Sequence, residues 1–484
     1  MTSPITFGTD GWRAVIADDF TYERVRAVAQ AVAWYLKDDR RGVVVGHDTR
    51  FSAELFAREV ARVLAANDQH VLLLDHPVPT PVITWTVVER HQAGGVAVTA
   101  SHNPAEFNGL KYKPDYGGSA SPEVVEELAS LSARALAEGL RQMTIDEAVE
   151  AGRVELVDPL PDYMLQVARL VDLPRLRTAG LRILHEPMYG AGMGLIKAAA
   201  GGGATTVTEM HSERNPGFGG MHPEPIGQYM PEAVERMRQG GFDLCIANEG
   251  DADRLGIIDE TGTFITQLEV MSLLAMYLLE KRGARGHLIR SLTSSSMLDR
   301  LGERFDVPVI ETPVGFKYIG PKMIETDALL AVEESGGYAF RGHIPERDGI
   351  VAGLMIAEMT VEYGMPVSAV LQHLFSLVGP HAYARHDIRF DREGYEARKQ
   401  AVYERMRGEK PAEIAGVAVT GTRSDDGFKF RLADGSWVLI RMSGTEPLMR
   451  VYAEAASPER VQTLLAAMEA IVGVEAPPEA GHGQ

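Results

Sequence analysis

Residues 99–104, Thr-Ala-Ser-His-Asn-Pro, form a segment of the 484-residue sequence that could carry chemistry. They follow an apolar run at 95–99 that predicts a strand, so Ser101 would lie at a strand's carboxyl end, where open α/β sheets place ligands. A serine there could be a nucleophile or could cap a turn, and no Gly-x-Ser-x-Gly hydrolase elbow surrounds it. Because neighbouring side chains diverge in an extended segment, we expect no direct contact between Ser101 and His102.

A second segment, residues 248–254, is acidic. Its carboxylates, Glu249, Asp251 and Asp253, alternate along the chain. In a straight strand they would lie about 7 Å apart, and a curved loop could gather them around one hard cation. A solvated acidic loop and an EF-hand are the alternatives, but an EF-hand needs glycine where Arg254 stands. Carboxylates without cysteine favour Mg²⁺, Mn²⁺ or Ca²⁺ over zinc.

Two further segments suit the recognition of anions and sugars. Residues 441–450 offer two arginines, two hydroxyls and an open glycine N–H, which are donors that phosphate prefers; a capped turn with solvated arginines is the alternative. Residues 333–337, Glu-Glu-Ser-Gly-Gly, and the nearby 342–349 suit sugar hydroxyls, or could form a plain surface loop. The glycine-rich segments 190–194 and 315–322 depart from the dinucleotide and P-loop patterns, so no nucleotide chemistry is expected.

Alternating strand and helix patterns must position these segments. A helix is predicted from an N-cap at Ser52 to Ala66, and another opens at Ser121-Pro122, with apolar strands before and between them. The same alternation returns in two later blocks, which predicts three α/β domains with mostly parallel sheets. In the last hundred residues a hairpin with an Asp434-Gly435 turn lies between helical stretches, which predicts a smaller α+β domain.

Composition narrows the class of protein. With 45% hydrophobic and 24% charged residues, the chain is typical of a globular protein of roughly three domains. The formal charge is 48 − 67 = −19, which disfavours a nucleic-acid partner and requires local cations for any anionic substrate. The longest apolar run is about ten residues, short of the roughly 20 that span a bilayer, and no secretory signal is evident, so we expect a cytoplasmic protein. The single cysteine, Cys245, is expected to be buried and inert.

Taken together, these segments resemble the α-D-phosphohexomutase family, which contains the phosphoglucomutases and phosphomannomutases. The matching segments follow the family's order: residues 7–13, 48–50, 79–81, 99–104, 108–111, 251–254, 315–317, 333–335 and 441–447. The resemblance implies four domains round a central cleft, three α/β and one smaller α+β. The expected domains are 1–154 with the phosphoserine loop, 155–262 with the metal loop, 263–380 with the sugar loop, 381–475 with the phosphate loop, and a frayed tail at 476–484.

The resemblance also implies roles for individual residues. Ser101 would carry a phosphoryl group, with His102, Arg13 and Lys111 as catalytic neighbours. One Mg²⁺ per chain would bridge Ser101 and the carboxylates Glu249, Asp251 and Asp253. The residues expected to bind the substrate are Arg254, Gly315, Lys317, Glu333, Ser335, His343 and Arg347. Those expected to bind its distal phosphate are Arg441, Ser443, Gly444, Thr445 and Arg450.

The implied activity is that of a phosphoglucomutase working through a phosphoserine, with hexose 1,6-bisphosphate as intermediate or activator. A phosphomannomutase or another phosphosugar mutase is the alternative within the family; a metal-dependent phosphosugar phosphatase and a non-catalytic sensor are alternatives outside it. A small phosphosugar is the expected partner of a monomer or homodimer, with no nucleic acid and no membrane. Two positions depart from the family: Glu249 stands where Asp is usual, and Gly337 where several members carry the His whose role His343 could take.

Overall fold

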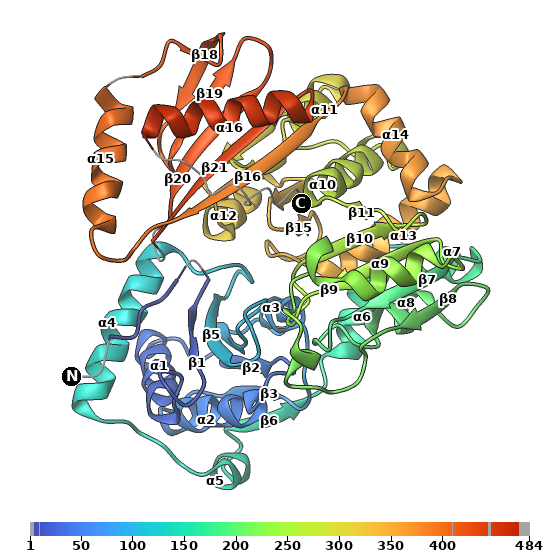
Figure 1. The fold of residues 1–484 in the computed structure, drawn as a ribbon. Helices are drawn as coiled ribbons and strands as arrows, with labels where there is room; N and C mark the ends of the chain where they lie inside the picture. The colour runs from blue at the N-terminus through green and yellow to red at the C-terminus, as the bar shows by residue number, and fades with distance from the viewer. Residues whose placement is uncertain (1–3, 9, 409, 444–446, 474–484) are drawn as a thin grey trace.

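The computed structural model describes residues 4–8, 10–408, 410–443 and 447–473. Consecutive parts of the chain form four sheets, each with its own helices, and these make four domains (Figure 1). The blue and cyan first domain and the orange and red fourth domain lie on one side of the view, and the green second domain lies opposite them. The predicted fold class is therefore confirmed, with three α/β domains and a C-terminal α+β domain.

The first domain has a six-stranded sheet whose two faces are both covered. Val43 and Val45 of β2 belong to a core with α1 and α2, while Val44 belongs to the core that contains α3. Burial on both faces explains why β2 is continuously apolar. The elements are β1 (Trp12–Val15), α1 (Tyr22–Tyr35), β2 (Val43–His47), α2 (Ala53–Ala66), β3 (Val71–Leu74), α3 (Thr80–Glu89), β4 (Gly94–Val98), β5 (Phe107–Pro114), α4 (Pro122–Glu138), α5 (Ile145–Glu150) and β6 (Val154–Val157).

The second domain has a five-stranded sheet in the order β11-β10-β9-β7-β8, in which β7, β8 and β9 are parallel. Its carboxyl-end loops, after β7 and β9, contact the first domain through Thr49 and Thr80. The elements are α6 (Leu160–Leu170), α7 (Leu173–Thr178), β7 (Arg182–Glu186), α8 (Leu195–Ala200), β8 (Thr206–Glu209), η1 (Phe218–Gly220), η2 (Gly227–Tyr229), α9 (Pro231–Arg238), β9 (Leu244–Asn248), β10 (Leu255–Asp259) and β11 (Phe264–Ile265).

The third domain has a four-stranded sheet in the order β13-β12-β14-β15, with only β15 antiparallel to its neighbour. The strongly apolar α13 also contacts β9 and β10, so the second and third domains share one core. The elements are α10 (Gln267–Met276) with its π-helical extension η3 (Tyr277–Lys281), β12 (Leu288–Ser291), α11 (Met297–Phe305), β13 (Val309–Thr312), α12 (Phe316–Thr326), β14 (Leu330–Glu333), β15 (Gly337–Phe340), α13 (Gly349–Tyr363) and α14 (Val367–Val378).

The fourth domain is an antiparallel sheet in the order β16-β21-β20-β19-β18-β17, with its own core on the face covered by α15 and α16. The predicted hairpin is confirmed as β19 and β20, with Gly435 at φ +83° in the turn. The tail expected to fray, 476–484, lies outside the described residues. The elements are β16 (Ala382–Arg389), α15 (Tyr395–Gly408), β17 (Glu413–Ile414), β18 (Val417–Arg423), β19 (Phe428–Leu432), β20 (Trp437–Met442), β21 (Leu448–Ala455) and α16 (Pro458–Val472).

Two details differ from the sequence-based expectations. Ser52 precedes α2 as predicted, but its backbone is left-handed at φ +57° and its side chain makes no capping hydrogen bond. Strand β6 crosses the boundary expected at residue 154, and it pairs with β3 of the first sheet. We therefore propose that the first domain extends through Val157, with the other boundaries as expected.

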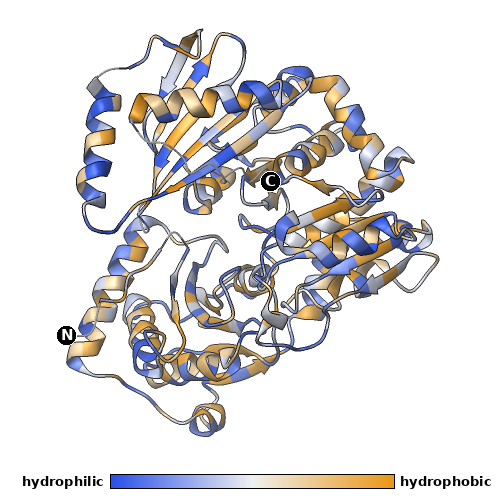
Figure 2. Ribbon diagram, in the orientation of Figure 1, coloured by the Kyte–Doolittle hydropathy of each residue, from blue (hydrophilic) through white to orange (hydrophobic). Residues whose placement is uncertain are grey.

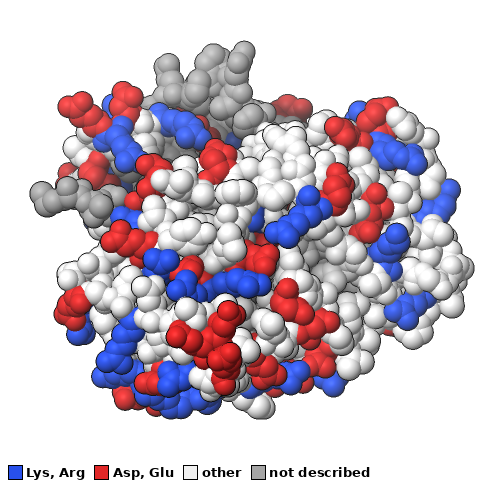
Figure 3. Space-filling model, turned by 90° about the horizontal axis from the view of Figure 1, so that it is seen from below, with Lys and Arg blue, Asp and Glu red and all other residues white. Residues whose placement is uncertain are grey.

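Apolar side chains lie mainly in the interior of the molecule and charged side chains mainly on its surface. Hydrophobic residues concentrate on the strands and on one side of the helices (Figure 2), and Cys245 in β9 is fully buried, as expected. Acidic and basic side chains lie interspersed on the face seen in Figure 3. Within the described residues no single helix is long and apolar enough to cross a bilayer; only α13 and α14 together meet that length and composition, and they are bent by 82°.

Candidate active site

The loop after β4 turns sharply at Ser101, whose backbone is left-handed at φ +54°. The turn brings the imidazole of the next residue back over the serine, with 3.2 Å between Ser101 Oγ and His102 Nδ1. The expectation that these two side chains diverge was therefore wrong, because the segment is not extended at Ser101. The hydroxyl also donates to Glu249 Oε2 over 2.9 Å, and only 1% of Ser101 is exposed.

The segment 48–50 after β2 holds this loop in shape. The buried Arg50 guanidinium donates to four backbone carbonyls of the loop, including Ser101 O at 2.6 Å and Asn103 O at 2.5 Å. Asp48 accepts from Thr99 Oγ1, which in turn accepts from the N–H of Ser101. Burial raises the pKa of Asp48 to about 6, against the opposing effect of Arg50. These contacts fix the strained turn that presents Ser101.

The acidic loop after β9 gathers its three carboxylates as predicted. One oxygen from each of Glu249, Asp251 and Asp253 lies within 4.8 Å of the others, and all three residues are fully buried. The second oxygen of each already has a partner: Glu249 accepts from Ser101, Asp251 accepts from Lys111 at 2.8 Å, and Asp253 forms an ion pair with Arg347 at 2.9 Å. Glu249 Oε1, Asp251 Oδ1 and Asp253 Oδ1 have no hydrogen-bond partner among the described residues. Three buried, unpartnered carboxylate oxygens fit a divalent cation.

This loop is also the point where three domains meet. Thr80, at the start of α3 in the first domain, donates from its hydroxyl and its N–H to Asp251. From the third domain, the N–H of Gly349 donates to Ala252 O, and Gly336 O accepts from Leu255. The position of the carboxylates therefore depends on the packing of all three domains.

A network of buried cations and carboxylates surrounds the acidic loop. Lys111 Nζ lies 3.1 Å from Asp10, 2.8 Å from Asp251 and 3.4 Å from Asp253, and these acids raise its pKa although burial opposes them. Arg13 donates to the neutral Asn103 Oδ1 at 2.7 Å. Against the effect of its burial, Lys111 and neighbouring cations hold the pKa of Asp10 well below its ordinary value.

Two imidazoles lie at this centre. Burial, together with Arg254 and Arg13, lowers the pKa of His102 well below its ordinary value. The ring of His222, from the loop before α9, is centred 6.3 Å from the His102 ring and is stacked on Tyr229. Sequence reasoning did not find His222, because nothing in the local pattern of its loop marks it.

Arg347 links the acidic loop to the predicted sugar loop. Its guanidinium lies 2.9 Å from both Asp10 and Asp253 and 3.7 Å from Glu333, which also accepts from Ser335 Oγ. Its aliphatic part passes over Gly337, where a Cβ would come within 2.2 Å of Arg347 Cδ. Glycine is therefore required at 337 by the path of this arginine. Arg254 completes the group, 3.4 Å from Glu249.

The predicted phosphate segment lies on the fourth domain. Arg441 and Arg450 are register partners on β20 and β21, so they share one face of the sheet. Arg441 Nε donates to Asp426 at 2.8 Å, and Ser443 O accepts from the hydroxyl of Tyr395. Gly444 and Thr445, also predicted there, lie outside the described residues.

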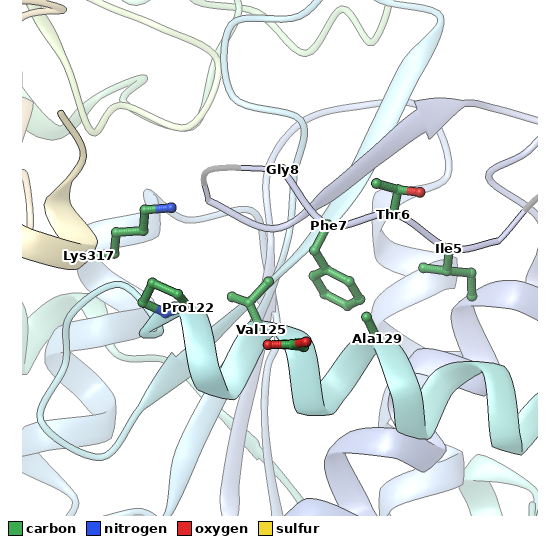
Figure 4. A pocket seen from close by; sticks show the side chains of 9 residues that line it. Ile5, Thr6, Phe7, Gly8, Pro122, Val125, Ala129 and Lys317 are labelled. Carbon is green, nitrogen blue, oxygen red and sulfur yellow. The ribbon is translucent and has the colours of Figure 1, made fainter. Parts of the chain in front are cut away.

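Three predicted substrate residues share no hydrogen bond or ion pair with Ser101 or the acidic loop within the described part of the chain. His343 is buried with Nε2 on Asp348 Oδ2 at 2.9 Å, and Asp348 caps α13. Gly315 is the N-cap of α12, and Lys317 in the first turn lines a cavity of about 320 Å³ beside α4 and the N-terminal segment (Figure 4). His343 therefore has its hydrogen-bond partner within the third domain and not in the acidic loop.

The architecture is of the phosphohexomutase type. Its four domains bring one serine close to a cluster of three carboxylates, and a pair of arginines lies on a separate domain. Family models described as phosphoglucomutase/phosphomannomutase domains I, II and III and C-terminal domain match residues 4–138, 161–262, 268–378 and 401–471. The chain belongs to the phosphoglucomutase/phosphomannomutase family, whose members are isomerase-type phosphotransferases.

Named relatives span nearly the whole chain. A phosphoglucomutase/phosphomannomutase of Thermococcus kodakarensis is 28% identical over 95% of this chain and 96% of its own length. A Methanothermobacter thermautotrophicus protein assigned as a phosphoglucosamine mutase is 30% identical over 95% and 96%. The crystal structure of a protein assigned as a phosphomannomutase from Thermus thermophilus is 32% identical, covers 98% of this chain and 100% of its own, and superposes with a TM-score of 0.83.

Proposed function

We propose that this protein is a phosphoglucomutase that interconverts glucose 1-phosphate and glucose 6-phosphate through a phosphoserine at Ser101 and a bisphosphorylated sugar. The observation that carries the proposal is the hydroxyl of Ser101, which is buried and donates to Glu249 within a group of unpartnered carboxylate oxygens and cations. Phosphoryl transfer requires this kind of positioning and charge neutralisation more than covalent participation by other side chains.

In the proposed reaction the bond between phosphorus and Ser101 Oγ breaks as a sugar hydroxyl oxygen bonds to phosphorus. The proton of that hydroxyl passes, in net terms, to Ser101 Oγ, where Glu249 Oε2 accepts it in a hydrogen bond. His102 Nδ1, at 3.2 Å, is within hydrogen-bond reach of the same oxygen; its lowered pKa favours the neutral ring, which would orient the hydroxyl. Arg13 and Lys111 would neutralise the charge of the transferring group.

The family is metal-dependent, and Glu249, Asp251 and Asp253 would hold the ion, for which we propose Mg²⁺. When bound, the cation would supply Lewis-acid neutralisation of the phosphoryl oxygens. Glu333 and Ser335 would bind sugar hydroxyls beside Arg254 and Arg347. Arg441, Ser443 and Arg450 would hold the distal phosphate, with Gly444 and Thr445 beside them in the sequence.

Burial of Ser101 favours a mutase over a phosphatase, because a phosphoserine shielded from water is not readily hydrolysed. The Glu-Glu-Ser-Gly-Gly loop at 333–337 resembles phosphoglucomutase-type members more than phosphoglucosamine mutases, which supports glucose over glucosamine. Mannose phosphate is the second candidate, because the Thermus relative at 32% identity is assigned as a phosphomannomutase. Hexose 1,6-bisphosphate would serve as intermediate or activator.

The test supplies the purified enzyme with Mg²⁺ and the 1-phosphates of glucose, mannose and glucosamine in turn. We expect glucose 6-phosphate to form fastest and free phosphate to stay at background, with one added phosphate on the intact protein that Ser101→Ala removes. Faster turnover of mannose 1-phosphate would replace the proposed substrate. Stoichiometric release of free phosphate would replace the mutase with a phosphatase, and full activity in Ser101→Ala would exclude the phosphoserine.

A further inference from the structure

Three arginines share the face of the fourth sheet that turns toward the third domain. Arg450 on β21 is the register partner of Arg441 on β20 and of Asp387 on β16. Arg385 lies two residues before Asp387, so it projects from the same face. Tyr452, two residues after Arg450, packs there against Leu292 of the third domain, which identifies the direction of this face.

The guanidinium of Arg385 contacts Asp387 on the same sheet and also Glu334 in the third domain. Its Nε lies 2.9 Å from Asp387 Oδ1, and the same oxygen is 3.7 Å from Arg450 Nε. Its Nη1 donates over 3.0 Å to Glu334 Oε1, which also accepts from the hydroxyl of Tyr383. Glu334 directly follows Glu333 of the proposed sugar loop.

These contacts leave Arg385 able to take another anion. The side chains of Arg385 and Arg450 are 27% and 29% exposed, so a ligand can reach both. A guanidinium has five N–H donors, of which one on Nη1 donates a hydrogen bond here, while Nε lies in an ion pair with Asp387 Oδ1. Arg450 Nε has no hydrogen-bond partner among the described residues. Planar guanidinium groups match phosphate oxygens better than a single carboxylate does.

We propose that Arg385 is a third arginine of the distal phosphate site and exchanges Glu334 for a phosphate oxygen when a phosphosugar binds. The proposal rests on the proposed function, which assigns the distal phosphate to Arg441 and Arg450. It involves only an exchange of non-covalent partners. Since Glu334 belongs to the third domain and Arg385 to the fourth, the exchange would couple phosphate binding to the contact between the two domains.

The test is equilibrium binding by calorimetry in a Ser101→Ala background, which removes turnover, with inorganic phosphate and glucose 6-phosphate as separate probes. Arg385→Gln should weaken both by about tenfold, the loss of one charge-assisted hydrogen bond. Glu334→Gln, which removes the competing anion, should instead tighten both by a few-fold. Arg405→Gln, at an exposed arginine on α15, controls for net charge and should change affinity by less than twofold.

The opposite signs of the two variants separate an exchange from a merely structural ion pair. Equal weakening by Arg385→Gln and Glu334→Gln would overturn the proposal, and so would unchanged binding in Arg385→Gln. If Arg385→Gln does not fold, Arg385→Lys, which keeps the charge, should bind phosphate more weakly than the parent. If Arg441→Gln also leaves binding unchanged, the proposed phosphate site itself fails; if only Arg385→Gln does so, this inference alone fails.

Discussion

The most specific prediction concerns Gly337, over which the side chain of Arg347 passes closely. A Cβ at this position would lie 2.2 Å from Arg347 Cδ and 2.5 Å from Cγ, and ordinary contact begins at 3.4 Å. The stem of Arg347 must therefore move by 3.4 − 2.2 = 1.2 Å in Gly337→Ala. These are atoms in the middle of the side chain, so the guanidinium cannot stay in place while they move.

A shift of that size removes the contacts that matter at the site. The distances from Arg347 to Asp10 and to Asp253, both 2.9 Å, would lengthen to about 2.9 + 1.2 = 4.1 Å, outside hydrogen-bond range. A hydrogen bond to a charged group contributes about 1.5–3 kcal/mol, so loss of the bond to Asp10 together with the ion pair to Asp253 would cost about 3 kcal/mol. Gly337→Ala should therefore lower kcat/KM by about 100-fold.

The assay is steady-state isomerisation of glucose 1-phosphate, accompanied by thermal unfolding of each variant. Gly421→Ala is the matched control, since a Cβ there meets only the side chain of Arg431, at 4.0 Å. Arg347→Ala should cost as much activity as Gly337→Ala, and the double variant should lose little more, because both act through one guanidinium. Parental kcat/KM in Gly337→Ala would refute the reasoning, and so would losses that simply add in the double variant.

Three further predictions follow from other contacts of the described residues. Arg50→Lys cannot reach the four loop carbonyls and should lower stability by about 3 kcal/mol and turnover by at least about 100-fold, measured by chemical unfolding and initial rates. Asp251→Asn should weaken Mg²⁺ binding at least about tenfold by calorimetry, and equal affinity would show that this loop is not the metal site. Burial and Arg290 lower the pKa of Lys429 from 10.5 to about 7. Between these pH values the unfolded chain binds a proton at Lys429 that the folded protein does not, so the free energy of unfolding rises with pH. Lys429→Met should abolish the resulting rise in Tm between pH 7 and 9.

Local pattern predicted the elements that carry the site. The helix predicted to open at Ser121-Pro122 does so, with Ser121 as its N-cap and Pro122 in its first turn, because both signals are local properties. The acidic loop was equally readable, since three alternating carboxylates after a buried strand would repel one another without a cation. The partner of each carboxylate was not readable, because Thr80 and Lys111 lie on a different domain.

The sequence-based predictions that failed did so because backbone conformation and contacts between distant residues are not visible in local sequence. The left-handed φ of Ser101 reverses the direction of its loop, and that conformation is imposed by Arg50, 51 residues earlier. Ser52 is likewise left-handed, and it stands at a helix start without a capping hydrogen bond. His343 is close in sequence to the sugar loop, yet Asp348 and the start of α13 determine its position.

The chain carries a net charge of −19, but the cations around Ser101 do not simply reverse that field. Lys111, Arg254 and Arg347 each contact at least two carboxylates, so their charge is already largely compensated. An anionic substrate would gain little from them unless those carboxylates took other partners.

Arg13 differs from these cations. Its side chain donates to the neutral amide of Asn103, so its charge is the one least compensated by a direct partner, although burial lowers its pKa. A divalent cation on Glu249, Asp251 and Asp253 would neutralise the acids that now compensate the charges of Lys111 and Arg254. Metal binding and anion binding should therefore reinforce each other, because each supplies the charge that the other lacks.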